Sequence, residues 1–313
     1  MSDQTAWQGF RKEIEEAQAL LKGRDDAAAP ALRTEVLASA LPSLLEQCRE
    51  MAGSPEAATA RPIRSIHHFA CTGGTLLSRC IAAMPNTEVL SEVDPLSTLG
   101  PRWSFMPSDL IGLARSGSRP PGQDILIRIF LAGLDVLAST ARQSGVSLIL
   151  RDHAHSQFCY DAGLSERPTL REMLMPDYTL LSLVSVRHPL DSYLSLRRQD
   201  WINFTPGSLE EYAGRYDAFL DRHDGVEILR YEDFVAAPEI QMQRICEILS
   251  LTYNADFRQI FPALRLSGDS GRRGDTIAPR PRWPVPDEVT VQIPQNKAYE
   301  NLCARLGYDP ESG

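Results

Sequence analysis

The sequence lacks two patterns that would assign its chemistry directly. It has no G-x-x-x-x-G-K-[ST] motif, which argues against an ordinary ATP- or GTP-dependent P-loop enzyme. Its six cysteines include no C-x-x-C pair, which indicates reduced thiols rather than a disulfide framework or a zinc site. Because no spacing of His or Cys suggests a metal centre, we expect no metal to be required.

Long hydrophobic runs and targeting segments are also missing. Apolar runs such as YTLLSLVSV are only long enough for a strand, whereas a membrane-spanning helix needs about 20 apolar residues. The opening MSDQTAWQGF lacks the basic and apolar regions of a signal peptide. The sequence therefore predicts a cytoplasmic protein without a membrane span.

Basic residues are too few for a general nucleic-acid binder. The 313 residues include 32 Lys and Arg against 41 Asp and Glu, a net charge of −9 at pH 7. Affinity for a phosphate backbone comes from accumulated positive charge, so we expect no nucleic-acid partner. Any anion site must be local, built from a few arginines and backbone N–H groups.

Hydrophobic periodicity divides the chain into two parts. Residues 1–60 predict an N-terminal helical extension, and residues 61–313 alternate short apolar strands with helices. This alternation is typical of a three-layer α/β domain with a central parallel sheet. We expect strands at 63–70, 87–91, 146–151, 178–186 and 226–230, and helices at 75–83, 124–142, 190–199, 208–222, 238–249 and about 288–306.

A small polar turn connects the first of these strands to the first helix. Thr72, Gly73, Gly74 and Thr75 stand where unpaired N–H groups and the positive end of a helix dipole favour an anion. The alternative is an ordinary strand-to-helix turn with a threonine cap.

The stretch CTGGTLLSRCIAAMPN, followed by VLSEVDPL, resembles the PAPS-dependent sulfotransferase family, in particular its bacterial, carbohydrate and tyrosylprotein types. The resemblance covers about residues 62–308 and implies a P-loop-like fold. In that family a loop between strand and helix wraps the 5′-phosphosulfate of PAPS. The corresponding residues here are Cys71, Thr72, Gly73, Gly74, Thr75 and Leu76.

Three later segments follow in the family's order. Arg187 ends a strand and Ser195 follows on the next helix, a spacing that the family uses to clamp the 3′-phosphate. Without the resemblance, Arg187 would be expected to pair with a nearby aspartate, Asp191 or Asp200. Tyr231 matches a tyrosine near the adenosine, and Arg272 or Arg273 matches a late basic loop that closes over the 3′-phosphate.

The resemblance leaves two candidates for the catalytic base. Glu92 matches the glutamate of the carbohydrate and tyrosylprotein types, with Asp94 a weaker match. His153, with Arg151 in place of a lysine, matches the K-x-H of the cytosolic enzymes, and His155 competes with it. We give Glu92 a slight preference because its surroundings match better.

Cys71 departs from the family, which usually has Lys or Arg just before the loop. Loss of one preorganised donor can cost about 10²–10³-fold in rate, so Arg151 or Arg79 would have to supply the charge. A thiol nucleophile at Cys71 is a weaker idea, since no partner base is evident.

The sequence therefore predicts a transferase that moves a sulfuryl group from PAPS to a hydroxyl of a small molecule, glycan or lipid, with PAP as product. The alternatives are a catalytically weak PAPS- or PAP-binding sensor or scaffold and, less favoured, a P-loop-like kinase. The acceptor pocket is expected in the loops 93–123 and 154–177. The N-terminal helices are candidates for packing on the sheet, covering the acceptor pocket or forming a homodimer.

Overall fold

The computed structural model describes residues 62–99, 108–160, 164, 166–266 and 274–311. The helical extension expected at 1–60 lies outside these residues, as do Arg272 and Arg273. Within the described part of the chain, no helix has the length and apolar character that crossing a bilayer requires.

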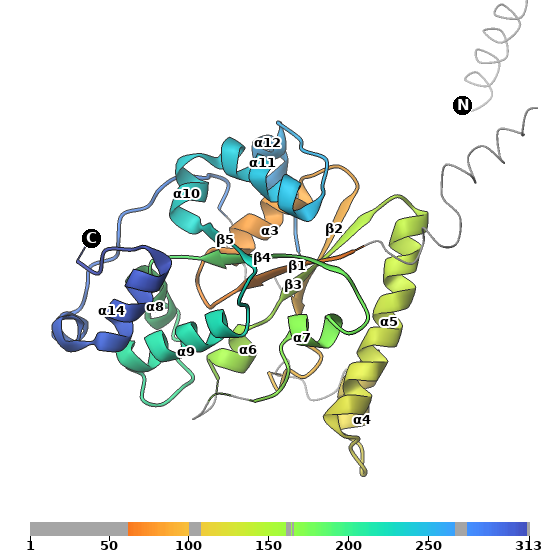
Figure 1. Cartoon of the computed structure of the whole chain (residues 1–313), viewed down its shortest axis with the longest axis horizontal. Coiled ribbons are helices and arrows are strands. Elements are labelled where there is room, and N and C mark those ends of the chain that lie inside the picture. Colours follow the sequence, from red (N-terminus) through yellow and green to blue (C-terminus); the bar gives the residue numbers. More distant parts are fainter. Residues whose placement is uncertain (1–61, 100–107, 161–163, 165, 267–273, 312–313) are drawn as a thin grey trace, which may run out of the picture. The chain divides into compact units, whose positions relative to one another are not determined.

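A five-stranded parallel sheet forms the centre of the domain (Figure 1). Its strand order is β2-β3-β1-β4-β5. The strands are β1 (Ile63–His68), β2 (Thr87–Val93), β3 (Ser147–Asp152), β4 (Leu180–Val186) and β5 (Glu227–Arg230). Central strands carry apolar side chains toward both faces, as expected for a parallel sheet covered by helices on both sides. The expected α/β fold with its parallel sheet is therefore confirmed.

Helices cover the two faces of the sheet in separate layers (Figure 1). One layer contains α3 (Gly74–Ala82), α10 (Tyr231–Ala236), α11 (Pro238–Leu249) and α12 (Phe257–Ile260). Their apolar side chains pack with Ile66, Ile149 and Leu183 of the sheet. The opposite layer contains α5 (Gln123–Gln143), α6 (His155–Phe158), α7 (Leu170–Leu174), α8 (Pro189–Arg198), α9 (Leu209–Asp221) and α14 (Lys297–Leu306).

The prediction of a single helix at about 288–306 is wrong. The structure has α13 (Asp287–Thr290), a 3-10 turn (Ile293–Gln295) and then α14. Pro294 lies within the turn, and the Asn296 side chain accepts a hydrogen bond from the Tyr299 N–H at 2.9 Å to cap the new helix. The sequence reading also missed short helices, α4 (Leu110–Arg115), α6, α7, α10 and α12.

Candidate active site

A cavity of about 560 Å³ opens at the carboxyl ends of the strands, the edge where open α/β sheets bind ligands. It gathers residues from β1, β2 and β3, the residue that follows β4, and the first residue of α10. Twelve residues that the sequence marks as site candidates line it: Cys71, Gly73, Gly74, Thr75, Leu76, Arg79, Glu92, Arg151, His153, His155, Arg187 and Tyr231. Thr72 and Ser195 lie nearby without lining it.

The turn after β1 leads into α3 without a side-chain cap. Gly73 holds the cap position with φ +91°, and a Cβ there would overlap the Tyr231 ring. A Cβ on Gly74 would overlap the His68 ring. Only glycine fits either position, and the first N–H groups of α3 are left without intrahelical partners at the cavity wall.

The two threonines of the turn have different surroundings. The Thr72 hydroxyl donates to the Phe69 carbonyl at 2.8 Å and is buried. It therefore does not supply the cavity with the donor that a threonine in this loop is expected to provide. The Thr75 hydroxyl lines the cavity and accepts a hydrogen bond from Arg151 Nη2 at 3.1 Å. The loop therefore presents backbone N–H groups and one threonine hydroxyl to the cavity, rather than two hydroxyls.

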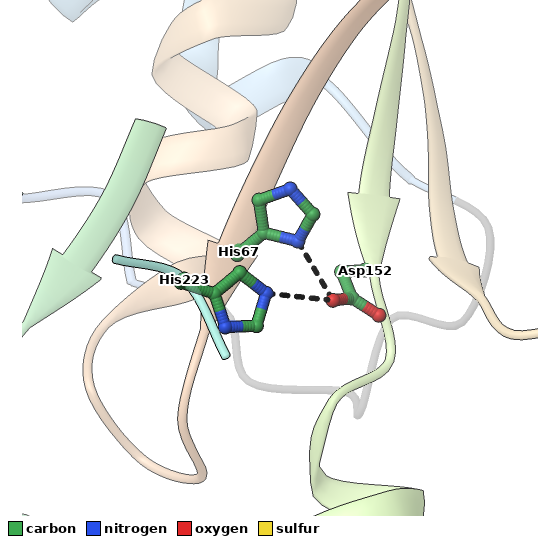
Figure 2. A group of neighbouring side chains, drawn as sticks. All are labelled: His67, Asp152 and His223. Atoms are coloured by element: carbon green, nitrogen blue, oxygen red, sulfur yellow. Dashed lines mark hydrogen bonds and ion pairs between the residues drawn. The ribbon is translucent and has the colours of Figure 1, made fainter. Parts of the chain in front are cut away.

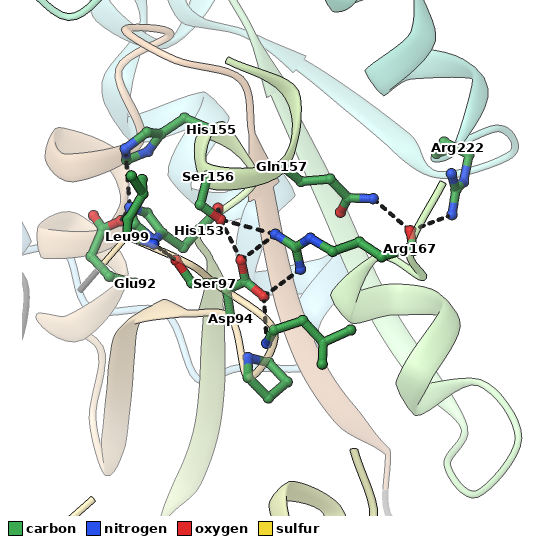
Figure 3. Close-up of polar contacts among 12 residues, drawn as sticks. Glu92, Asp94, Ser97, Leu99, His153, His155, Ser156, Gln157, Arg167 and Arg222 are labelled. Carbon is green, nitrogen blue, oxygen red and sulfur yellow. Dashed lines mark hydrogen bonds and ion pairs between the residues drawn. The ribbon is translucent and has the colours of Figure 1, made fainter. Parts of the chain in front are cut away.

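A β-bulge directs Glu92 into the cavity. The register between β2 and β3 shifts between Leu90 and Val93, and Glu92 has φ +61°, a left-handed conformation that is unusual for a residue other than glycine. Glu92 Oε1 lies 2.7 Å from Arg151 Nη1, and Oε2 lies 3.2 Å from His153 Nε2 (Figure 3 shows Glu92 beside His153). Both candidate bases therefore lie in one cluster.

Arg151 connects this cluster to the loop. Its guanidinium is almost fully buried and donates to Ser91 Oγ at 2.7 Å in addition to pairing with Glu92. Its Nη2 atom lies 3.0 Å from His68 Nε2 and 3.1 Å from Thr75 Oγ1. A positive charge thus stands beside the loop, on which Cys71 provides none.

The environments of the two candidate bases shift their pKa values in opposite directions. Burial raises the pKa of Glu92 even though the Arg151 charge acts to lower it. Burial also lowers the pKa of His153 to about 4, and the neighbouring His155 has a pKa of about 3 for the same reason. At neutral pH both imidazoles are therefore uncharged, and a raised pKa makes the Glu92 carboxylate a stronger base.

Asp94, the weaker match for the base, is committed to a structural contact. Arg167 binds both of its carboxylate oxygens, at 2.7 and 2.6 Å, and Ser156 donates to one of them (Figure 3). Burial acts to raise the pKa of Asp94, but the hydrogen bonds from Arg167 and Ser156 outweigh it and lower the pKa. This carboxylate holds the segment after β2 against the one after β3.

Arg187 and Ser195 are in contact at the other end of the cavity. Arg187 Nη1 lies 3.3 Å from Ser195 Oγ, and the guanidinium carbon lies 5.0 Å from the centre of the Tyr231 ring. Asp191 pairs instead with Arg282 at 2.7 Å, so the competing pairing of Arg187 with this aspartate does not occur.

Two further arginines line the cavity. Arg79 donates to the carbonyls of Pro262, Leu264 and Gly274 at 2.9 to 3.2 Å, so its donors hold the chain on either side of 267–273. It is therefore a poor substitute for the cation missing at Cys71. Arg280, which the sequence analysis missed, contributes an exposed guanidinium that no motif marks. Trp201 and Asn203 were missed for the same reason.

The charge of the lining residues is strongly positive, although the whole chain is acidic. Among the described residues that line the cavity are four arginines, Arg79, Arg151, Arg187 and Arg280, against the one carboxylate of Glu92. The lining therefore has the local positive charge that an anion site in an acidic chain would need.

Among the residues that the structure describes, two groups of side chains have metal-ligating atoms close together. Glu92, His153 and His155 form one group, at the cavity. The other is fully buried and consists of His67, Asp152 and His223 (Figure 2).

Comparison with known proteins supports the fold through structure rather than sequence. No protein-family model matches the sequence, and no curated protein matches it. The sulfotransferase domain from the Synechococcus PCC 7002 olefin synthase superimposes with a TM-score of 0.53 at 20% identity, covering 80% of this chain and 96% of that one. The sulfotransferase domain from the curacin biosynthetic pathway superimposes with a TM-score of 0.50 at 13% identity, covering 80% and 99%. The chain has the fold of sulfotransferase domains, as the resemblance implies.

Proposed function

We propose that the protein is a sulfotransferase that transfers a sulfuryl group from PAPS to a hydroxyl of a small molecule, glycan or lipid. The observation that carries the proposal is one cavity lined by the loop before α3, by the Glu92–Arg151 pair and by Arg187, whose guanidinium contacts Ser195. A sulfotransferase needs a group that binds the 5′-phosphosulfate, a base and a group that binds the 3′-phosphate, all within reach of one donor molecule. We assign the activity to residues 61–313.

The donor occupies the cavity along its positively charged wall. The unpaired N–H groups at the start of α3 and the Thr75 hydroxyl bind the 5′-phosphosulfate. Arg187, which also contacts Ser195, binds the 3′-phosphate, because a guanidinium can donate two parallel hydrogen bonds to phosphate oxygens. The Tyr231 ring lies beside that guanidinium and offers an apolar face to the adenosine.

Glu92 acts as the general base in the transfer. It accepts the proton of the acceptor hydroxyl while that oxygen forms its bond to sulfur, and the bond from sulfur to the 5′-phosphate oxygen breaks. The electron pair of the broken bond stays on PAP. Arg151, beside Thr75, and the α3 N–H groups stabilise this developing charge. His153, neutral and in contact with Glu92, is the alternative base.

A catalytically weak PAP-binding protein is the second candidate, and Cys71 is the observation that favours it. Arg151 approaches the loop from β3 rather than from the loop itself, so its charge supports the leaving group from a different direction than a residue at position 71 would. Turnover distinguishes the two functions.

Two measurements test the proposal. Calorimetry with PAP should give binding that Arg187→Ala weakens by at least about 10-fold, since a charged hydrogen bond is worth roughly 1.5–3 kcal/mol. Arg197→Ala is the matched control, because Arg197 lies in the last turn of α8, is not among the residues that line the cavity, and pairs with Glu288 at the surface. Radiolabelled PAPS with a panel of hydroxyl acceptors then measures transfer. An absence of PAP binding rejects both functions, and binding without transfer to any acceptor leaves only the second.

A further inference from the structure

The buried group of titratable side chains lies directly behind the cavity. Successive residues of a strand point to opposite faces, so His68 and Arg151 face the cavity while their neighbours His67 and Asp152 face away. His223, just beyond the end of α9, completes the group (Figure 2). The side chains of His67, Asp152 and His223 are 0%, 5% and 0% exposed.

His223 presents an unsatisfied nitrogen to this group. Its Nδ1 lies 2.7 Å from the Phe219 carbonyl, which can only accept, so Nδ1 carries the proton and Nε2 carries a lone pair. No described residue gives this buried Nε2 a hydrogen bond. It points at Asp152 Oδ2, 3.9 Å away, and both side chains are buried. A buried lone pair without a partner is unfavourable, and a cation between the two atoms would satisfy both of them.

We propose that His67 Nδ1, Asp152 Oδ2 and His223 Nε2 bind one divalent transition-metal cation, with Zn²⁺ the best match to the donors. Two imidazoles and a carboxylate are a common Zn²⁺ ligand set. Tetrahedral ligands at Zn²⁺ bond lengths lie about 3.3 Å apart. The contacts of Asp152 Oδ2 with His67 and His223, at 2.7 and 3.9 Å, bracket that spacing, and all three donor atoms lie within 4.8 Å of one another.

The surrounding hydrogen bonds fit metal-bound imidazoles, which usually donate their second N–H to a fixed acceptor. His223 donates to the Phe219 carbonyl. His67 Nε2 lies 2.9 Å from Ser65 Oγ, which lies 2.8 Å from Ser182 Oγ, so a proton on Nε2 has an acceptor when Nδ1 binds the cation.

Burial prepares the three side chains for a cation. It lowers the pKa of His67 and of His223 to about 3, so both lone pairs are available at neutral pH. It raises the pKa of Asp152 to about 7, and a bound cation would offset the cost of its charge.

The ion would have a structural role, because it would tie β1 and β3 to the end of α9 behind the cavity. It is independent of the proposed function, and neither PAPS nor an acceptor enters its test.

Titration of the purified full-length chain with Co²⁺, after removal of metals with a chelator, tests the site. We expect one equivalent to bind with visible d–d absorption. His223→Asn and Asp152→Asn should each weaken binding by more than about 100-fold, since loss of even a partner of a ligand costs about 10–100-fold. Asparagine at 223 retains an N–H for the Phe219 carbonyl, which favours folding of the variant.

His155→Ala is the matched control, because it removes a donor from the other group, at the cavity. The proposal is overturned if His155→Ala abolishes Co²⁺ binding while His223→Asn leaves it unchanged. It is also overturned if the folded wild type binds no equivalent of Co²⁺. Anomalous diffraction from Co²⁺-loaded wild-type crystals needs no variant. It should place the ion between His67, Asp152 and His223, and an ion elsewhere likewise overturns the proposal.

Discussion

Glu92 Oε1 lies 2.7 Å from Arg151 Nη1, and the other terminal nitrogen of Arg151 lies 3.1 Å from the Thr75 hydroxyl. One buried guanidinium therefore links the candidate base to the loop that is proposed to hold the leaving group. In the proposed reaction a proton arrives at Glu92 while negative charge develops at the loop. Arg151 contacts both places, so its charge is available to each throughout the transfer.

Replacement of the base should separate chemistry from binding. We expect Glu92→Gln to lower kcat by about 10²–10⁴-fold, the usual contribution of a general base, because an amide cannot accept the proton. Affinity for PAP should remain, since Gln can still accept from Arg151. His153→Gln is the matched variant and should have a smaller effect on kcat. A larger loss in His153→Gln would identify the histidine as the base.

The pH dependence of transfer distinguishes the same two candidates. A base works when deprotonated, so the rate should fall as pH drops through its pKa. Because burial raises the pKa of Glu92, the acid limb of kcat should lie above the ordinary glutamate value of 4.5. The pKa of His153 is lowered to about 4, so a limb near pH 4 that persists in Glu92→Gln would contradict our assignment.

Restoring the loop cation should increase turnover. We expect Cys71→Lys to raise kcat by up to about 10²–10³-fold, the usual worth of one preorganised donor at a developing charge. Cys71 already has φ +64°, so the substitution introduces no new positive-φ residue. Cys71→Ala should leave kcat nearly unchanged. A large loss in that control would indicate a role for the thiol, and a lower rate in Cys71→Lys would count against the match of position 71.

Replacement of a loop glycine, even by alanine, should impair both the fold and PAP binding. Gly73→Ala should reduce PAP affinity and destabilise the fold by about 1–3 kcal/mol, because its Cβ would overlap the Tyr231 ring at a left-handed φ. Gly133→Ala on α5 is the control, since nothing lies near its Cβ; it should stabilise by about 0.5–1 kcal/mol. Calorimetry and urea unfolding measure both variants. Unchanged PAP binding in Gly73→Ala would exclude the loop from the donor site.

Acid should destabilise the fold as the pH falls below 6.5, because the histidines are buried. All six histidines have folded-state pKa values lowered by burial, so the unfolded chain binds more protons below pH 6.5. Stability is then retained above pH 6.5 and lost as pH falls from there toward 4. The raised pKa values of Asp152 and Glu92 act in the opposite direction but are outnumbered.

Urea unfolding at pH 5 and pH 7 measures this dependence. The free energy of unfolding should be lower at pH 5, and His223→Asn should reduce the difference because it removes one of the titrating groups. A protein that is more stable at pH 5 would show that the histidines remain protonated in the fold.

The sequence determined the layers of the fold and most of the cavity. Strands such as Leu180–Val186 are apolar on both faces, and that pattern alone requires helices on both sides of a parallel sheet. Local motifs at strand ends also identified Glu92, Arg151 and Arg187. The carboxyl ends of parallel strands lie along one edge of the sheet, where ligands bind.

Only the tertiary structure decided how those side chains are used. The turn after β1 keeps the Thr72 hydroxyl out of the cavity, and the bulge in β2 directs Glu92 into it. Arg79 is held by backbone carbonyls from distant segments. The buried group of His67, Asp152 and His223 joins three parts of the chain with no ligand spacing that a sequence could reveal. Local patterns fix which residues face inward, whereas distances between remote residues arise only when the strands and helices pack.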